Sequence, residues 1–299
     1  MNVVNSEEGQ AQAMEQLAEL FNKRPVAPVA PVAKFDPRSI PVRHSRLKLI
    51  GRSPAHYRYG IEHGIEDTLA MRLGRAVHLL LLGGVPKLLV YPGKTRRGKD
   101  WDAFKRLYPA SSDGEEGYEI LTEPEMDTAE AMAAAVRLHP DAMRLLKGEH
   151  ELKLEWTLAG RKCTARLDVA GDRFVTDLKS AVDAKPERFQ QVSLGMGYYS
   201  QLAWYLDGAA QVLAPRCFDR AFIVSVESKP PHVVTPYEVT PAALDFGRRT
   251  ARLWFEQLLV CEASDTWPGY LDGVGRLDVS MEDEDLDLLL PEDNEEQAV

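Results

Sequence analysis

Two aspartates and a lysine stand close together in the segment TARLDVAGDRFVTDLKSA, residues 164–181. A turn after Asp168 can bring this residue beside Asp177, and strand alternation puts Asp177 and Lys179 on one side, about 6.5–7 Å apart. Two carboxylates held this close repel each other unless a cation joins them. A hard divalent ion such as Mg²⁺ takes oxygen ligands, and the lysine can orient or deprotonate a water for attack on phosphorus. The pattern therefore favours metal-dependent phosphodiester hydrolysis over ordinary turn, strand-edge and surface roles for these residues.

Side chains on two predicted helices are candidates to complete this site. His78 follows Gly74 in the segment GRAVH, and a glycine one turn earlier leaves room for close packing. His78 is either a metal ligand through a neutral nitrogen or a hydrogen-bonded core residue. Tyr198, Gln201 and Tyr205 fall on one helix face. They either contact a phosphate or the attacking water, or belong to a buried face whose tyrosine hydroxyls are satisfied within the protein.

A run of strands between helical segments must position these residues. Residues 151–158 and 162–169 alternate and predict a hairpin around Ala159-Gly160, followed by a strand over 173–179. Glu155, on the first hairpin strand and about opposite Thr164, is either a third acid near the site or solvent-facing. We expect further strands at 221–226 and 232–239, and helices at 45–50, 54–59, 67–82, 123–146, 186–206 and 241–259, with Ser45 and Ser53 as N-caps. This order predicts an α/β (α+β) fold with a central mixed β-sheet flanked by helices.

The stretch KTRRGKDWDAFKR, residues 94–106, holds six basic and two acidic side chains with two interleaved aromatic residues. Lysine and arginine pair with phosphates without reading sequence, and a tryptophan can stack on an end base. The plainer interpretation is a solvated loop and helix start. With one arginine of the GRAVH helix added, the candidates for DNA contact are Arg75, Arg96, Arg97, Lys99 and Trp101.

The distribution of charge matters more than the net charge of −10. Residues 281–299 carry nine acidic side chains and no basic one. Removing these nine from the 46 acidic residues leaves 37 against 36 basic ones, so the body of the chain is nearly neutral. The acidity does not exclude nucleic acid as a ligand, and it gives no positive support for one.

Cysteine usage and hydropathy bound the cellular setting. Cys163, Cys217 and Cys261 lie far apart, whereas zinc or iron–sulfur sites built on thiolates usually need four ligands in close pairs. We expect reduced, structural thiols. No apolar run reaches the roughly 18–20 residues that cross a bilayer, and the N-terminus lacks the pattern of a signal peptide. We therefore expect a cytoplasmic protein that does not enter the membrane.

Composition divides the chain into three parts. Residues 1–36 comprise a short amphipathic pattern at 6–23 and a proline-rich linker, which form either a floppy tail or a tethered docking helix. Residues 37–275 form the main domain. Residues 276–299 form an acidic tail that we expect to be disordered.

Several ordered segments resemble the RecE group of phage-type exonucleases, also called exonuclease VIII, within the PD-(D/E)XK nuclease superfamily. The resemblance covers roughly residues 41–271, and its segments are HSRLKLIGRSPAHYRYG, GRAVHLLLLGG, RRGKDWDAFK, LEWTLAGRKCTARLDVAGDRFVTDLKSA, GYYSQLAWYLDGA and WPGY. It implies a restriction-endonuclease-like core, in which a central mixed sheet carries metal ligands on a strand hairpin. The order of the segments is more specific than any one of them.

The resemblance also implies an activity, residue roles and partners. The activity is processive digestion of linear double-stranded DNA from the 5′ end, leaving a 3′ single strand for recombination in a bacterial or phage-infected cell. A ring-shaped homo-oligomer and a single-strand annealing protein are the implied partners. Mg²⁺, or Mn²⁺ as an alternative, would be bound by His78, Asp168, Asp177 and the Leu178 carbonyl, while Lys179 acts on the water and Gln201 and Tyr205 support the site.

The sequence departs from the family pattern at three points. Asp177 stands where relatives often carry a glutamate, and Leu167 stands where proline commonly precedes the first aspartate. The four cysteines of the iron–sulfur branch are missing, so we expect no cluster. Two other functions stay open: a structure-specific or single-strand nuclease on the same fold, and a non-catalytic protein that binds DNA ends.

Overall fold

The computed structural model describes residues 35–64, 67–93, 95–111 and 117–277. The chain divides into two units, Met1–Asp36 and Pro37–Val299, and every element named below belongs to the second. The predicted helix at 6–23, the proline-rich linker before residue 35 and the acidic tail from residue 278 onward lie outside the described residues.

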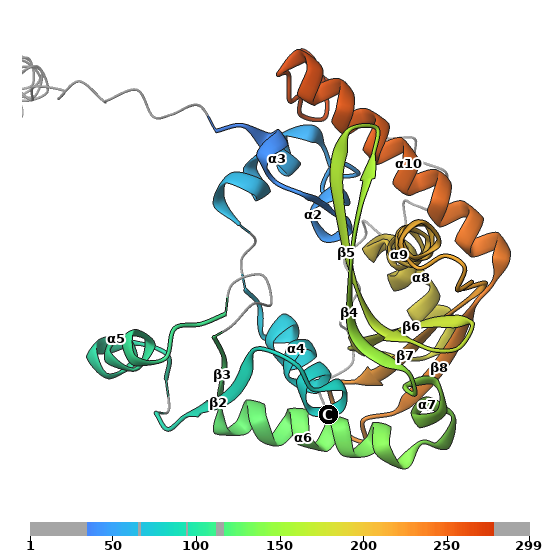
Figure 1. The fold of residues 1–299 in the computed structure, drawn as a ribbon. Coiled ribbons are helices and arrows are strands. Elements are labelled where there is room, and N and C mark those ends of the chain that lie inside the picture. The colour runs from blue at the N-terminus through green and yellow to red at the C-terminus, as the bar shows by residue number, and fades with distance from the viewer. Residues whose placement is uncertain (1–34, 65–66, 94, 112–116, 278–299) are drawn as a thin grey trace, which may run out of the picture. The chain divides into compact units, whose positions relative to one another are not determined.

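A mixed sheet of six strands is the centre of the part that the structure describes (Figure 1). The strands are β1 (Val42–Arg43), β4 (Glu149–Leu158), β5 (Arg161–Ala170), β6 (Phe174–Ala181), β7 (Arg220–Glu227) and β8 (Val234–Val239). Their order is β1-β5-β6-β7-β8, with β4 paired to β5. The pairs β1–β5 and β6–β7 are parallel, whereas β4–β5, β5–β6 and β7–β8 are antiparallel. The prediction of a central mixed sheet and of a hairpin turning at Ala159-Gly160 is confirmed.

Helices cover both faces of this sheet. On one face lie α4 (Leu69–Leu82), α6 (Glu123–Leu138) and α7 (Pro140–Leu145); on the other lies α9 (Tyr198–Val212), with α10 (Pro241–Ser264) packed behind it (Figure 1). Leu178 and Val224 of the sheet pack with Val77 of α4 and Met132 of α6 in the first layer. The remaining helices are η1 (Pro37–Ser39), α2 (His44–Leu47), α3 (Pro54–His63), α5 (Gly98–Leu107) and α8 (Pro186–Met196). In the described ranges, no helix is long and apolar enough to span a membrane.

Two helices that the sequence predicts as continuous are each broken in the structure. The helix predicted over 186–206 divides into α8 and α9 because Gly197 adopts the left-handed conformation, with φ 74°. The helix predicted over 123–146 divides at His139, which is extended because the residue before a proline avoids the helical region. Ser53 caps α3 as predicted and accepts a hydrogen bond from the His56 N–H. Ser45 is not a cap, since it lies inside α2, whose N-cap is Arg43.

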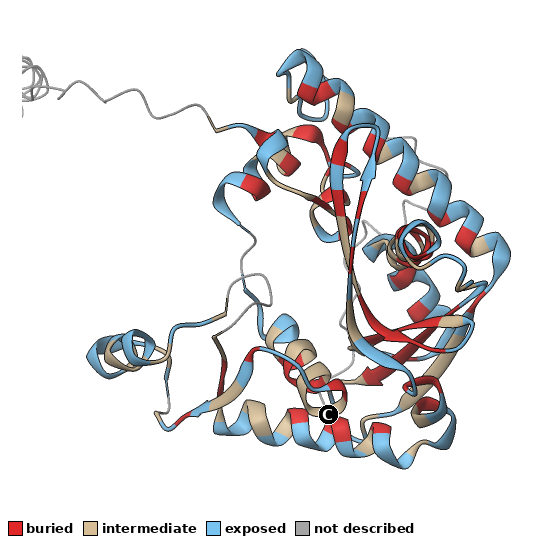
Figure 2. Ribbon diagram, in the orientation of Figure 1, coloured by how far each residue is buried: buried red, intermediate tan, exposed pale blue. Residues whose placement is uncertain are grey.

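A second, two-stranded sheet was not predicted. It pairs β2 (Lys87–Tyr91) with β3 (Tyr118–Thr122) in parallel, and α5 lies between them in the chain. No residue of α5 is buried (Figure 2). Its aromatic side chains pack on the small sheet, with the Trp101 and Phe104 rings 5.0 and 4.9 Å from the ring of Tyr91. Short apolar runs such as KLLVY carry too little periodicity to identify a strand.

A buried ion pair ties the start of β5 to the end of α10. Arg161 Nε lies 2.9 and 3.2 Å from the two carboxylate oxygens of Glu262. The same guanidinium donates to the carbonyl oxygens of Arg38 at 2.8 Å and Ile40 at 3.0 Å. Arg161 therefore fixes the chain that leads into β1 against the sheet.

We expect Arg161→Met to lower the free energy of unfolding by about 3–5 kcal/mol, because it leaves the Glu262 carboxylate buried without a partner. Urea denaturation measures this change. Lys162→Met is the matched control: its ammonium pairs with Glu155 at the surface, 2.8 Å away, and such pairs contribute about 0–1 kcal/mol. Equal, small losses for both variants would show that the buried pair does not anchor the fold.

Candidate active site

The site lies where β5 and β6 separate. Within these strands, pairing is limited to Val169 with Thr176 and Ala170 with Val175. Beyond Thr176, β6 continues to pair with β7 on its other edge. The Leu178 N–H and C=O therefore face the edge that β5 has left.

Asp168 and His78 form hydrogen bonds with these two main-chain groups. The Leu178 N–H donates to Asp168 Oδ2 at 2.8 Å, and His78 Nε2 donates to the Leu178 carbonyl oxygen at 2.7 Å. His78 Nδ1 lies 3.5 Å from Asp168 Oδ2. The separation of the strands thus brings together three of the predicted metal ligands: His78, Asp168 and the Leu178 carbonyl.

Helix α4, which packs on one face of the sheet, positions His78 at this site. Thr68 begins the helix by accepting a hydrogen bond from the Met71 N–H, and Gly83 ends it. One turn before His78, a side chain at Gly74 would place its Cβ 3.2 Å from Ser180 Oγ of β6. The glycine therefore allows the close approach of helix and strand that the sequence predicts.

Asp177 and Lys179 project on the same side of β6, as predicted. Lys179 Nζ lies 2.5 Å from Asp177 Oδ2 and sits over the Tyr198 ring, 4.9 Å from its centroid. Gln201 Nε2 donates to the other Asp177 oxygen at 3.1 Å and to the Tyr205 hydroxyl at 2.7 Å. The predicted face of α9 therefore contacts the buried Asp177 and the half-buried Lys179 directly.

Electrostatics fixes the protonation states of these groups. Burial raises the pKa of Asp177 to about 6, with Asp168 adding to the shift and Lys179 opposing it. Burial alone would lower the pKa of Lys179, but Asp177 and Asp168 raise it above its usual range. Burial, followed by the same two carboxylates, also raises the pKa of Tyr205. At neutral pH Lys179 is therefore an ammonium, which favours orienting a water over deprotonating it.

The third acid of the site is Glu151. The pairs His150 with Val169 and Leu152 with Leu167 place it opposite Asp168 in the hairpin. Its backbone has φ 55°, a left-handed conformation uncommon for glutamate. Burial raises the pKa of the Glu151 carboxyl, and the charge of Asp168 raises it further.

Glu155 was predicted either to fill this role or to face solvent. Glu155 lies opposite Thr164 as predicted, but it is exposed and pairs with Lys162. The solvent-facing alternative is therefore correct. The signal for Glu151 is present in the sequence, since counting back from a two-residue turn at Ala159-Gly160 puts Glu151 opposite Asp168.

His78, Glu151 and Asp168 fit a divalent metal ion. Each offers one ligand atom, and the three atoms lie within 4.8 Å of one another. The two carboxylates repel each other, and a hard cation such as Mg²⁺ or Mn²⁺ between them would relieve this repulsion. Asp177 and the Leu178 carbonyl, also predicted as ligands, make the protein contacts described above, and their metal coordination stays a prediction.

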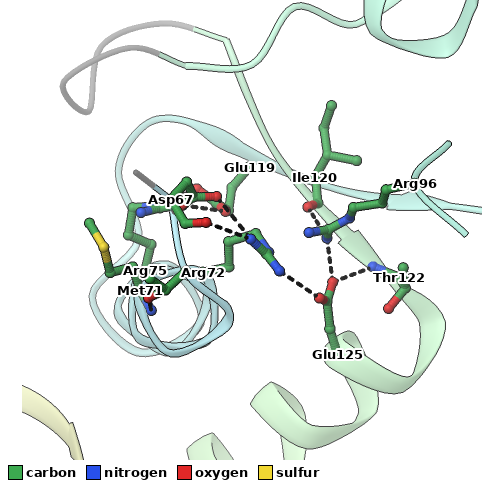
Figure 3. Close-up of polar contacts among 10 residues, drawn as sticks. Asp67, Met71, Arg72, Arg75, Arg96, Glu119, Ile120, Thr122 and Glu125 are labelled. Atoms are coloured by element: carbon green, nitrogen blue, oxygen red, sulfur yellow. Dashed lines mark hydrogen bonds and ion pairs between the residues drawn. The ribbon is translucent and has the colours of Figure 1, made fainter. Parts of the chain in front are cut away.

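The predicted DNA contacts fall into two groups. The Arg75 guanidinium lies 2.6 and 3.0 Å from the Glu119 carboxylate oxygens and 2.7 Å from Asp67 Oδ1, while Arg96 pairs with Glu125 and donates to the Ile120 carbonyl at 2.7 Å (Figure 3). Both arginines are thus engaged with protein acids that link α4, β3 and α6. By contrast, Arg97 and Lys99 are exposed at the start of α5, and Trp101 is partly covered by its aromatic neighbours. Contact of all five residues with DNA stays a prediction.

The sequence matches one known protein family. The family model described as "PDDEXK-like domain of unknown function (DUF3799)" matches residues 43–278, which include every site residue from His78 to Tyr205. The chain belongs to this PDDEXK-like family. Its membership in the PD-(D/E)XK superfamily agrees with the strand hairpin and the Asp177–Lys179 pair found here.

A solved structure with a similar fold agrees with the PDDEXK-like assignment. A crystal structure from Eubacterium rectale, named "Putative exonuclease", superposes with a TM-score of 0.55 at 16% identity, covering 82% of this chain and 92% of that one. At this identity the likeness concerns the fold. The crystal structure of SSO0001 has a TM-score of 0.31 at 14% identity, covering 88% of this chain and 98% of that one. No curated protein matches the sequence.

We expect Glu151→Gln to weaken Mn²⁺ binding about tenfold or more, because the cluster loses one of its two charged oxygen ligands. Isothermal titration calorimetry without DNA measures this affinity. Glu155→Gln, the same change on the same strand, serves as control and should bind as the unmodified protein does. If the two variants bind Mn²⁺ equally, Glu151 is not a metal ligand.

Proposed function

We propose that this protein is a divalent-metal-dependent deoxyribonuclease that digests linear double-stranded DNA from the 5′ end and leaves a 3′ single strand. One observation carries the nuclease part of the proposal. An acidic cluster that fits a divalent metal ion (His78, Glu151 and Asp168) adjoins a half-buried, protonated lysine on a PDDEXK-like fold. This combination is suited to phosphodiester hydrolysis.

The residues of the site have distinct roles in this proposal. His78, Glu151 and Asp168 would hold Mg²⁺, which supplies charge neutralisation at the phosphate and a water of lowered pKa. Lys179 donates a hydrogen bond to the attacking water or to a phosphate oxygen. Asp177 fixes the direction of the lysine through its 2.5 Å contact.

Gln201 and Tyr205 act on the site from α9. Gln201 holds the second oxygen of Asp177, and Tyr205 accepts from the same amide group. With its raised pKa, Tyr205 stays a neutral phenol and adds no charge beside the carboxylates. The two residues thereby preserve the orientation of the aspartate–lysine pair.

The choice of linear duplex and of 5′→3′ direction rests on family likeness. The sequence segments resemble the RecE group, and the Eubacterium rectale structure carries an exonuclease name. The site itself acts on a phosphodiester and does not recognise an end. A structure-specific or single-strand nuclease is therefore the alternative outcome of the test below.

We expect linear duplex DNA, labelled separately at each end, to lose its 5′ label in Mg²⁺ and to survive in EDTA. Asp168→Ala and Lys179→Ala should each slow digestion about 10²–10³-fold or more, as loss of one charge-stabilising group does in other enzymes. Glu155→Gln should digest DNA at the normal rate. Product release is followed on a denaturing gel.

The other outcomes divide the alternatives. Loss of the 3′ label first would reverse the proposed direction. Cutting of closed circles or of single strands alone would replace the exonuclease with the structure-specific or single-strand nuclease. If no DNA is cut in Mg²⁺ or Mn²⁺, the remaining function is binding of DNA ends without catalysis.

We further propose that the protein acts in the cytoplasm as a ring-shaped homo-oligomer. Its single-stranded product would then be bound by a single-strand annealing protein. Processive digestion requires that the strand stay enclosed, so we expect light scattering to give a mass several times that of one chain. A purified annealing protein should be retained by the full chain and lost on deletion of residues 1–36 or of 276–299. A monomer that binds no such protein would contradict both parts.

A further inference from the structure

The chain entering the sheet is strongly basic. Between residues 37 and 61 there is no aspartate or glutamate, and the basic side chains are Arg38, Arg43, Arg46, Lys48, Arg52 and Arg58, with His44 and His56. Within this segment β1 runs parallel to β5, with Val42 beside Cys163 and Arg43 beside Thr164. Helix α2 therefore continues in the direction of the end of β5 that carries Asp168.

Contacts of α2 with α9 bring this basic segment to the active site. His44 Nε2 lies 2.9 Å from Ser200 Oγ in the first turn of α9. Ser200 precedes Gln201, and the same turn contains Tyr198, whose ring lies under the Lys179 ammonium. Lys48 is four residues after His44 and so lies on the same side of the helical turn.

Lys48 is a half-buried cation that no acid among the described residues balances. Burial lowers its pKa first, and repulsion by Lys179 lowers it further. Burial and both lysines also lower the pKa of His44 to about 3, so the imidazole is neutral. In the ranges that the structure describes, no carboxylate forms an ion pair with Lys48, unlike the arginines Arg75 and Arg161.

This arrangement is unfavourable in the protein alone. A partly buried ammonium has lost hydration, and a second ammonium nearby adds repulsion. Asp177 already compensates Lys179 at 2.5 Å, so it does not serve Lys48. A phosphate group would compensate Lys48, because lysine binds phosphate as a point charge without reading base sequence.

We propose that Lys48 is a phosphate-binding residue, whose ammonium contacts a backbone phosphate of the DNA strand held at Lys179. The inference deepens the proposed nuclease function and rests on it. Lys48 is a binding and positioning residue: it acts on the strand beside the reacting bond and leaves the chemistry to Lys179 and the acidic cluster.

The test measures binding and turnover of the full chain on a 20-base-pair duplex. We expect Lys48→Gln to weaken binding about tenfold in fluorescence anisotropy with EDTA, and to lower the slope of log Kd against log salt by about one unit, the effect of one lost phosphate contact. In Mg²⁺, KM should rise by a similar factor while kcat changes less than about twofold. Lys48→Arg should retain most of the affinity and the salt slope.

Lys162→Gln is the matched control, since this lysine is exposed and lies about 20 Å along β5 from Asp168. It should bind and digest DNA normally. Lys48→Gln should also melt at or above the temperature of the unmodified protein, because it removes an uncompensated charge. A lower melting temperature would indicate a structural role and overturn the proposal.

The remaining outcomes separate this inference from the proposed function. If the unmodified protein digests DNA but Lys48→Gln matches it in Kd, salt slope and KM, the phosphate contact is wrong and the nuclease stands. Equal losses for Lys48→Gln and Lys162→Gln would reduce the effect to overall charge and also overturn the contact. If the unmodified protein neither binds nor digests DNA, the proposed function fails first.

Discussion

The early end of pairing between β5 and β6 is the constraint on which the active site depends. In a strand in the middle of a sheet, the N–H and C=O groups normally form hydrogen bonds with the two adjacent strands. Here the edge of β6 at Leu178 has lost its neighbour, and the Asp168 carboxylate and the His78 imidazole replace it. The break removes two hydrogen bonds between the strands. The main-chain groups of Leu178 that it leaves open orient the side chains of Asp168 and His78. The flanking helices are arranged around this break: α4 supplies His78 from one face, and α9 supplies Gln201 to the other.

Charge balance is the second organising factor. Three carboxylates from the neighbouring strands β4, β5 and β6 lie close together, and among the described residues Lys179 pairs with Asp177 while Arg166 pairs with Glu151. Burial raises the pKa values of Asp177 and Glu151, and the charge of Asp168 raises both further. Lys48, whose pKa is lowered by burial and by repulsion from Lys179, forms no ion pair within the described ranges. The acidic cluster is suited to a metal ion, and the proposed partner of Lys48 is a phosphate.

The sequence was sufficient for the parts of this arrangement that depend on local spacing. Strand alternation placed Asp177 with Lys179, helical spacing placed Gln201 with Tyr205, and the turn residues Ala159-Gly160 fixed the hairpin. The GRAVH segment offered His78 as a ligand or a core residue; the family likeness favoured the ligand and added the Leu178 carbonyl, which spacing alone does not connect to it. In each case the decisive information lay within one element or in an ordered set of motifs.

What could not be predicted depends on contacts between distant segments. Nothing local in GRAVH shows that Arg75 meets Glu119, or in RRGK that Arg96 meets Glu125. The break of the predicted 186–206 helix at Gly197 follows from a left-handed backbone that glycine permits but does not require. Lys48 is informative only once the β1–β5 register and the His44–Ser200 contact are known.

The two-residue turn of the β4–β5 hairpin has a consequence for how this protein can vary between relatives. With the turn at Ala159-Gly160, Glu151 faces Asp168, and both side chains point to the same face of the sheet. One residue gained or lost in that turn would move the opposite partner of Asp168 to a neighbour whose side chain points to the other face. Insertions of any length are usually tolerated at exposed hairpin tips. This tip lies some 25–30 Å along the strand from the acidic cluster, yet its length sets which residue faces Asp168. We therefore expect relatives to vary in length at other loops and not at this turn.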